Sequence, residues 1–123
     1  MGNIESNDPR KGKVFRILDK DGKIVNKKAE PKLKKEELFR LYEFMILSRA
    51  VDEKAEKLQR SGRMGTFAQT LGQEAQVGAA LAMKKEDWLF PSFRETAALL
   101  LRGMPASHYY LYFMGNEEGN RMP

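Results

Sequence analysis

Apolar side chains recur at helical spacing along the central part of the chain. Between about residues 34 and 59 most of them fall three or four positions from another, with Lys, Glu and Arg between them. The apolar series is Leu38, Leu41, Tyr42, Met45, Val51, Ala55 and Leu58. This spacing predicts one long packing helix, and Gly62 is expected to end it.

Two β-prone runs near the N-terminus flank a turn sequence. Residues 14–18 and 23–26 lie on either side of Lys20-Asp21-Gly22, and Asp-Gly between such runs favours a β-hairpin. Residues 1–12 are polar, with Gly, Asn, Pro and Lys, and we expect them to form a disordered basic leader. The leader is followed by a predicted hairpin arm over residues 13–33.

The remainder, residues 34–123, is predicted to be mainly helical. After a Gly-punctuated loop, a helix rich in Ala and Gly is expected over 73–83, and Thr70 and Gln73 have the spacing of a capping box at its start. Its small side chains would let another backbone approach closely. A last, aromatic-rich helix is expected over 106–114, before Gly115.

The segment from Asp87 to Pro105 has the pattern of a short strand that leads into a helix. Residues 88–90 form an apolar run too short for a helix, and Pro91 cannot donate to a β-ladder, so a strand must end there. Ser92 and Glu95 again have capping-box spacing, which predicts a helix from Ser92 to Gly103.

Arg94 is the most informative residue of this segment. In the first turn of the predicted helix, its positive charge would oppose the helix dipole, and a bound anion would remove that conflict. The sequence therefore leaves an anion site open. The alternative is an ordinary ion pair with Glu95 or Asp87.

Composition and charge limit the remaining function classes. The chain has 123 residues and no cysteine, which excludes disulfides and thiolate chemistry. Its net charge is +5, but residues 1–40 hold 12 basic and 7 acidic side chains, whereas residues 41–123 hold 10 of each. The basic excess is thus N-terminal, and residues 1–33, ahead of the predicted long helix, carry one aromatic residue, Phe15, which argues against nucleic-acid binding. No apolar window is long enough for a membrane helix.

The residues alone do not form a complete catalytic site. His108 is the single histidine, and no nucleophile can be paired with it. Glu117 and Glu118 are adjacent acids in a Gly-flanked loop, where solvated side chains are the usual finding. We therefore predict no catalytic residue and no metal ligand within this chain.

Three motifs together resemble the N-terminal part of the α subunit of thiamine-diphosphate-dependent 2-oxo acid dehydrogenases. They are GRMGTFAQTLGQEA, DWLFPSFRETAALLLRGMP and YFMGNEEGNRMP, in that order, and the resemblance extends over about residues 14–123. It implies the leading portion of an α/β thiamine-diphosphate-binding fold, mostly helical, with the N-terminal β-hairpin and one short strand at 88–90.

The resemblance also implies a set of cofactor-binding residues. Phe93 and Arg94 match the aromatic-Arg pair that contacts thiamine diphosphate in this family, with the arginine reaching the diphosphate. Ser92, the preceding residue, is implied near the cofactor. Most relatives have Tyr at the position of Phe93, so a hydroxyl is missing here. Gly72 to Glu74 match a sequence typical of the family, for which we expect a supporting role beside the site.

Other parts of the family's site do not occur in this sequence. The element that holds Mg²⁺ and the diphosphate, from Gly-Asp-Gly to Asn, and the catalytic histidines lie farther along family members, and the glutamate that activates the cofactor belongs to the β subunit. We therefore expect a fragment or truncated product of an α subunit. The implied partners are the β subunit, usually in a heterotetramer, and the lipoyl acyltransferase core of a cytoplasmic complex.

Three function classes remain at this point. The first is the α subunit of an enzyme that decarboxylates pyruvate or a branched-chain 2-oxo acid and passes the acyl group to lipoamide. The second is a non-catalytic helical interaction module derived from that family. The third, a nucleic-acid-binding arm, is favoured by the isoelectric point alone.

Overall fold

The computed structural model describes residues 14–121, so the predicted leader over residues 1–12 lies outside the described residues. The chain divides into two compact units, Met1–Leu33 and Lys34–Pro123. Among the described residues, no helix combines the length and the hydrophobicity that a membrane crossing requires.

The N-terminal unit contains a turn instead of the predicted β-hairpin. Leu18 and Ile24 form one isolated antiparallel bridge, and Gly22 takes a positive φ of 76°. The Asp19 side chain accepts hydrogen bonds from the backbone N–H groups of Asp21 and Lys23, at 2.9 and 2.8 Å. These bonds stabilise the turn itself. A two-stranded ribbon is marginal without a third strand or a helix to cover it, so the arms do not extend into strands.

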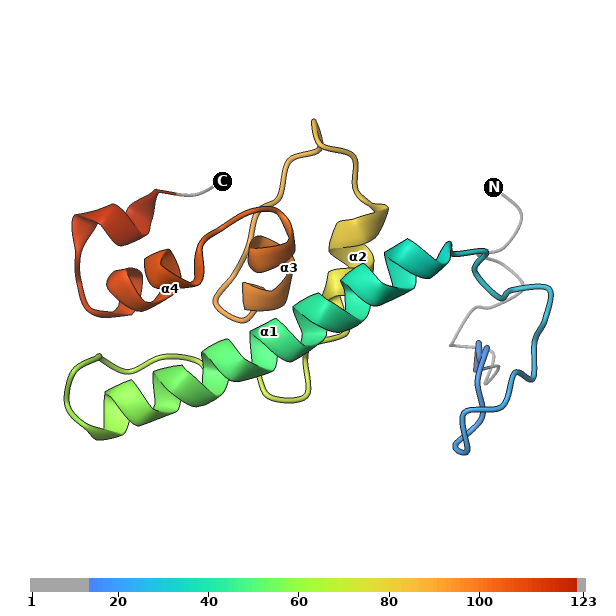
Figure 1. Cartoon of the computed structure of the whole chain (residues 1–123), viewed down its shortest axis with the longest axis horizontal. Helices are drawn as coiled ribbons and strands as arrows, with labels where there is room; N and C mark the ends of the chain where they lie inside the picture. The colour runs from blue at the N-terminus through green and yellow to red at the C-terminus, as the bar shows by residue number, and fades with distance from the viewer. Residues whose placement is uncertain (1–13, 122–123) are drawn as a thin grey trace. The chain divides into compact units, whose positions relative to one another are not determined.

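The second unit consists of helices arranged along one long helix (Figure 1). α1 spans Lys35–Arg60 and is followed by α2 (Gln76–Ala82), α3 (Thr96–Leu101), α4 (Ala106–Phe113) and a short 3-10 helix, η3 (Glu117–Asn120). Glu37 accepts a hydrogen bond from the Lys34 N–H at the start of α1. Gly62, with φ 70°, ends α1 as predicted, because its N–H bonds to the Gln59 carbonyl.

The predicted α/β fold class is wrong for the described residues, which contain helices and no strand. Residues 88–90 have no regular secondary structure and pair with no strand in the part of the chain that the structure describes. Trp88 and Phe90 are 82% and 84% exposed, and their rings stack on each other at 6.0 Å. The physical reason for the failed prediction is that a strand exists only where another strand supplies hydrogen-bond partners.

α3 lies between two parts of the hydrophobic core. Leu100 packs with Val51 and Ala55 of α1, whereas Leu101 and Ala97 pack with Val77 of α2. The small side chains at this contact are Ala80 of α2 and Ala97 and Ala98 of α3. The close approach predicted for the other small residues of 73–83 is wrong, because Gly78 and Ala79 are exposed and a Cβ at Gly78 would meet no atom within 4 Å. α3 thereby fixes the loop that precedes it, which contains Arg94.

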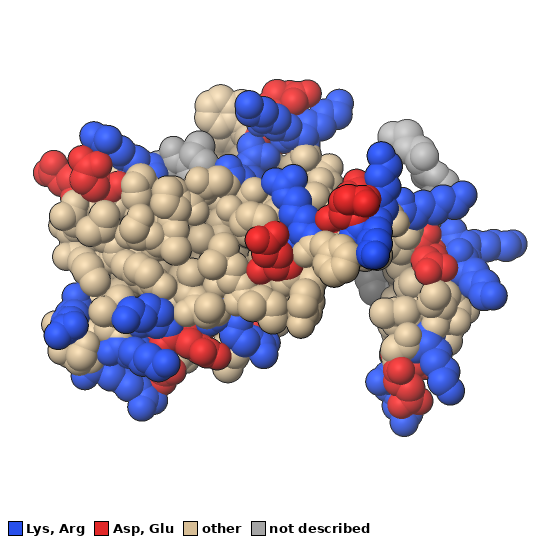
Figure 2. Space-filling model, viewed as in Figure 1, with Lys and Arg blue, Asp and Glu red and all other residues tan. Residues whose placement is uncertain are grey.

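The N-terminal half of α1 leaves apolar side chains exposed. Leu38 and Tyr42, which helical spacing predicted as packing residues, are 53% and 63% exposed, and Phe39 and Ile46 are exposed beside them. Figure 2 shows uncharged side chains gathered over the middle of the second unit, with Lys and Arg around them. Exposed apolar side chains gathered on one helix, as on α1, are typical of a region that contacts other protein.

Candidate functional site

A loop between α1 and α2 is fastened to α1 by a buried carboxylate. Asp52 accepts hydrogen bonds from the Thr70 backbone N–H at 2.8 Å and from the Thr70 hydroxyl at 3.1 Å. Both residues are buried, at 5% and 2% exposed. The predicted capping box of Thr70 and Gln73 does not form, because Asp52 takes the Thr70 hydroxyl, and α2 begins only at Gln76.

An ion pair also holds this loop against α1, one turn before Asp52. Arg49 donates from Nη2 and Nε to Glu74 Oε1, at 2.7 and 2.9 Å, and the Gly72 N–H donates to the same oxygen at 3.2 Å. Hydrogen bonds from the Glu74 backbone N–H and from Arg49 hold the pKa of Glu74 below its usual value, although its burial acts in the opposite direction. Gly72 and Glu74 thus fold the loop onto α1.

The lowered pKa of Glu74 makes the stability of this loop depend on pH. A carboxylate with a depressed pKa in the folded state stabilises at neutral pH and loses that contribution as the pH falls through its folded-state pKa. We expect the free energy of unfolding to decline below about pH 5 and to decline less in Glu74→Gln. Urea unfolding at a series of pH values measures this, with exposed Glu53→Gln as the control. Equal slopes in wild type and Glu74→Gln would show that the pair contributes nothing.

Arg94 lies before a helix and not in its first turn. The helix predicted to begin at Ser92 begins at Thr96 instead. In the predicted capping box Glu95 would accept a hydrogen bond from the Ser92 N–H, but Glu95 Oε2 accepts one from the Arg94 N–H, at 3.2 Å. The argument from the helix dipole therefore does not apply to Arg94. Its guanidinium donates to the Gln69 carbonyl at 2.5 Å and lies 5.6 Å from the centre of the Phe93 ring.

No carboxylate in the part of the chain that the structure describes forms an ion pair with Arg94. The two alternatives that the sequence left open are otherwise engaged. Glu95 bonds to the Arg94 backbone, and Asp87 Oδ2 accepts a hydrogen bond from the Lys84 N–H at 2.8 Å. Arg94 thus presents an exposed, uncompensated positive charge with four further N–H donors. That arrangement suits a carboxylate, phosphate or diphosphate.

Ser92, Phe93 and Arg94 are all exposed, but they line two different cavities. Arg94 lines a cavity of about 420 Å³ with Gln69 and residues from the C-terminal part of α1. Ser92 and Phe93 line a second cavity of about 250 Å³, together with His108 and Tyr109 of α4. The three predicted residues are therefore adjacent, and they face separate spaces.

The second cavity offers little for acid–base chemistry. His108 Nδ1 lies 3.1 Å from the Arg121 carbonyl oxygen, which occupies that ring nitrogen. Burial raises the pKa of Tyr109 to about 12, so its hydroxyl stays protonated at neutral pH. In residues 14–121, no group of three or more His, Asp or Glu side chains is arranged to hold a metal ion.

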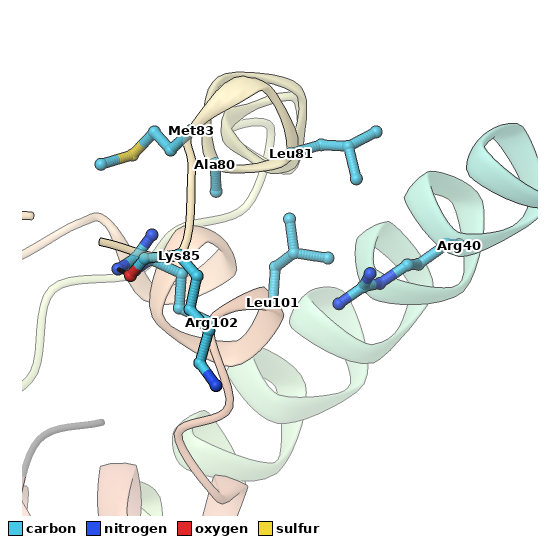
Figure 3. A pocket seen from close by; sticks show the side chains of 7 residues that line it. All are labelled: Arg40, Ala80, Leu81, Met83, Lys85, Leu101 and Arg102. Carbon is cyan, nitrogen blue, oxygen red and sulfur yellow. Dashed lines mark hydrogen bonds between the residues drawn. The ribbon is translucent and has the colours of Figure 1, made fainter. Parts of the chain in front are cut away.

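A third cavity, of about 490 Å³, lies between α1, α2 and α3 (Figure 3). Arg40 points toward it from α1, and Leu81 and Leu101 line it from α2 and α3. Arg102 is held by the carbonyl oxygens of residues 84, 85 and 87, at 2.9 to 3.2 Å. Arg102 thus ties the loop after α2 to the end of α3, a structural contact.

Sequence reasoning missed the residues that hold Arg94. The Gln69 carbonyl accepts from its guanidinium, and the Gln76 side chain donates to the Arg94 carbonyl at 2.7 Å. Gln69 and Gln76 lie 25 and 18 residues before Arg94, and no local spacing signals such contacts.

Comparison with known proteins identifies the family. The sequence model described as "Dehydrogenase E1 component" matches residues 42–122.

The chain belongs to the dehydrogenase E1 component family. Three relatives in this family are pyruvate dehydrogenase E1 component alpha subunits. The protein from Acholeplasma laidlawii is 48% identical over 106 residues, which is 85% of this chain and 31% of that protein. The proteins from Staphylococcus aureus and Bacillus subtilis are 36% and 37% identical, over 92% and 89% of this chain.

This E1 chain spans about a third of the length of the curated relatives it matches. The match confirms the family that the three motifs indicated. It also includes the whole segment from Phe67 to Arg94, so the loop, α2 and the candidate cofactor residues all lie in the part assigned to the family.

Proposed function

We propose that this chain forms the N-terminal part of the α subunit of a pyruvate dehydrogenase and contributes Arg94 to the binding of thiamine diphosphate. The observation that carries the proposal is the exposed Arg94 guanidinium, held at the Gln69 carbonyl and unpaired with any carboxylate of the described residues. A diphosphate group is the ligand chemistry that suits it, since guanidinium binds phosphate oxygens through paired N–H donors.

The residues beside Arg94 fit a bound diphosphate cofactor. The cavity of about 420 Å³ on the guanidinium side is within the size range of ligand sites. It is lined by Phe67 and, on α1, by Gln59 and the Glu56–Arg60 ion pair, in which Arg60 neutralises the one carboxylate of the lining. Phe93 lies against the guanidinium and restricts its orientation. Ser92 is a weaker candidate because it lines the other cavity.

When bound, thiamine diphosphate would supply the carbanion chemistry that decarboxylates a 2-oxo acid. The chain's own residues would bind and orient its charged end. Arg94 would hold the diphosphate, and Phe93 would limit the movement of Arg94. The loop from Phe67 to Gly72 would fix the position of the guanidinium through the Gln69 carbonyl. Mg²⁺ would take its ligands from residues outside this chain.

The substrate and the partners follow from the relatives. Pyruvate is favoured over a branched-chain 2-oxo acid because the three relatives are named as pyruvate dehydrogenase subunits. The partners would be a β subunit, which would complete the site in an α–β assembly, and a lipoyl acyltransferase core that accepts the acyl group. The location would be the cytoplasm. The exposed apolar face of α1 is a suitable surface for contacts within such an assembly.

A chimeric enzyme tests the proposal. Residues 14–121 of this chain replace the corresponding part of the Acholeplasma laidlawii α subunit, which is paired with its own β subunit. We expect thiamine-diphosphate-dependent decarboxylation of pyruvate within about tenfold of the parent enzyme, a difference of about 1.4 kcal/mol in the barrier. A chimera that folds and assembles but lacks activity would instead favour the non-catalytic interaction module.

A further inference from the structure

Arg94 is held at both ends by segments that are distant in sequence. Its guanidinium donates to the carbonyl of Gln69, and its own carbonyl accepts a hydrogen bond from the Gln76 side chain. The first contact sets the position of the charged group, and the second sets the position of the backbone from which it extends. A side chain with four rotatable bonds needs both restraints to keep its charge in one place.

The Gln69 end of this arrangement is itself fixed. Gln69 is followed by Thr70, whose N–H and hydroxyl both bind the buried Asp52 carboxylate on α1. The carbonyl that receives Arg94 is therefore attached to the longest helix of the unit. Movement of this carbonyl would break two buried hydrogen bonds.

The side-chain amide of Gln76 has a defined orientation. Both hydrogens of its side-chain amide are used, one on the Arg94 carbonyl at 2.7 Å and one on Gln73 Oε1 at 3.1 Å. The remaining Oε1 atom is buried and has no hydrogen-bond partner in the described part of the chain. A reversed amide would place this oxygen against the Arg94 carbonyl oxygen, so the contacts allow one orientation only.

We propose that Gln76 is a positioning residue for the diphosphate site: it holds the Arg94 backbone so that the guanidinium reaches the anion. This inference rests on the proposed function, since it concerns the same site. Gln76 itself does not reach the cofactor in this role. It acts through Arg94, and it connects the first residue of α2 to the loop before α3.

A double-mutant cycle in the chimeric enzyme tests this coupling. Gln76→Met keeps the length of the side chain and removes both donors, and we expect the apparent dissociation constant for thiamine diphosphate to rise about three- to tenfold. In the Arg94→Ala background the same substitution should change that constant by less than about twofold, because the residue it positions is gone. Gln73→Met is the matched control, since it removes the other partner of Gln76 and leaves the Arg94 contact in place.

The outcomes separate this inference from the proposed function. If Arg94→Ala weakens binding but the effect of Gln76→Met is absent or simply additive, Gln76 is a structural residue and the inference fails alone. If Arg94→Ala leaves the affinity for thiamine diphosphate unchanged, the proposed role of Arg94 is wrong, and the role of Gln76, which depends on it, is wrong as well. Should Gln76→Met not fold, Gln76→Asn keeps the amide with a shorter reach, and the same cycle with it gives the same decision.

Discussion

Replacing Arg94 with alanine should raise the apparent dissociation constant for thiamine diphosphate by about ten- to a hundredfold in the chimeric enzyme. The expected loss is the ~1.5 to 3 kcal/mol of a charge-assisted hydrogen bond to an ionised phosphate. The dissociation constant of Arg94→Lys should fall between those of wild type and Arg94→Ala, because an ammonium keeps the charge but cannot donate two parallel N–H groups. Cofactor titration followed by the onset of activity measures all three proteins.

The stability of the cofactor-free protein distinguishes binding from folding. Arg94 is exposed, and its side chain contributes one hydrogen bond to the Gln69 carbonyl, so Arg94→Ala should lower the free energy of unfolding by no more than about 1 kcal/mol. Arg40→Ala is the control, since it removes the same charge from an exposed position on α1. A large loss of stability with unchanged cofactor affinity would make Arg94 a structural residue.

The isolated chain should bind thiamine diphosphate with Mg²⁺ no more tightly than about 1 mM, or roughly −4 kcal/mol. The reason is that the described residues offer one uncompensated arginine beside the cavity and no cluster of carboxylates for the metal. The described residues therefore attract the Mg²⁺–diphosphate complex mainly through one exposed guanidinium, and a single exposed charge contributes little attraction in water. Isothermal titration calorimetry on residues 1–123 gives the affinity.

A micromolar dissociation constant for the isolated chain would contradict this expectation. It would mean that the residues present form a complete site. Inorganic pyrophosphate with Mg²⁺ is the informative second titrant, because it retains the anionic part of the cofactor and lacks the thiamine rings.

Helix ends were predictable from sequence where a single residue determines them. Gly62 and Gly115 both take a positive φ, at 70° and 74°, and the helices before them end where the sequence predicted. Helix starts were predicted less well. Two capping-box spacings failed because the residues concerned bond elsewhere: Thr70 to Asp52, 18 residues away, and Glu95 to the adjacent Arg94 N–H.

The two β predictions failed for a different reason. Residues 88–90 have the composition of a strand, but composition does not provide the neighbouring strand that hydrogen bonding requires. The Asp-Gly turn did form, as the positive φ of Gly22 shows, yet the arms beside it make one bridge only. Turn chemistry is local, whereas pairing depends on partners that the sequence pattern cannot identify.

The candidate site divides in the same way. Phe93 and Arg94 could be named from the sequence because a motif contains them side by side. Gln69 and Gln76 could not, since they meet Arg94 only after the chain has folded back from α2. The sequence also left open whether Arg94 pairs with Glu95 or Asp87. In the structure both carboxylates accept backbone hydrogen bonds and neither forms an ion pair with Arg94.

In the proposed site, Arg94 binds the diphosphate and not another part of the cofactor. The most direct measurement compares the affinities of the chimeric enzyme for thiamine diphosphate and for thiamine, in wild type and in Arg94→Ala. We predict that the substitution reduces the preference for the diphosphate by about tenfold or more and leaves the affinity for thiamine unchanged. An equal loss of affinity for both ligands, or a loss for neither, would contradict the claim.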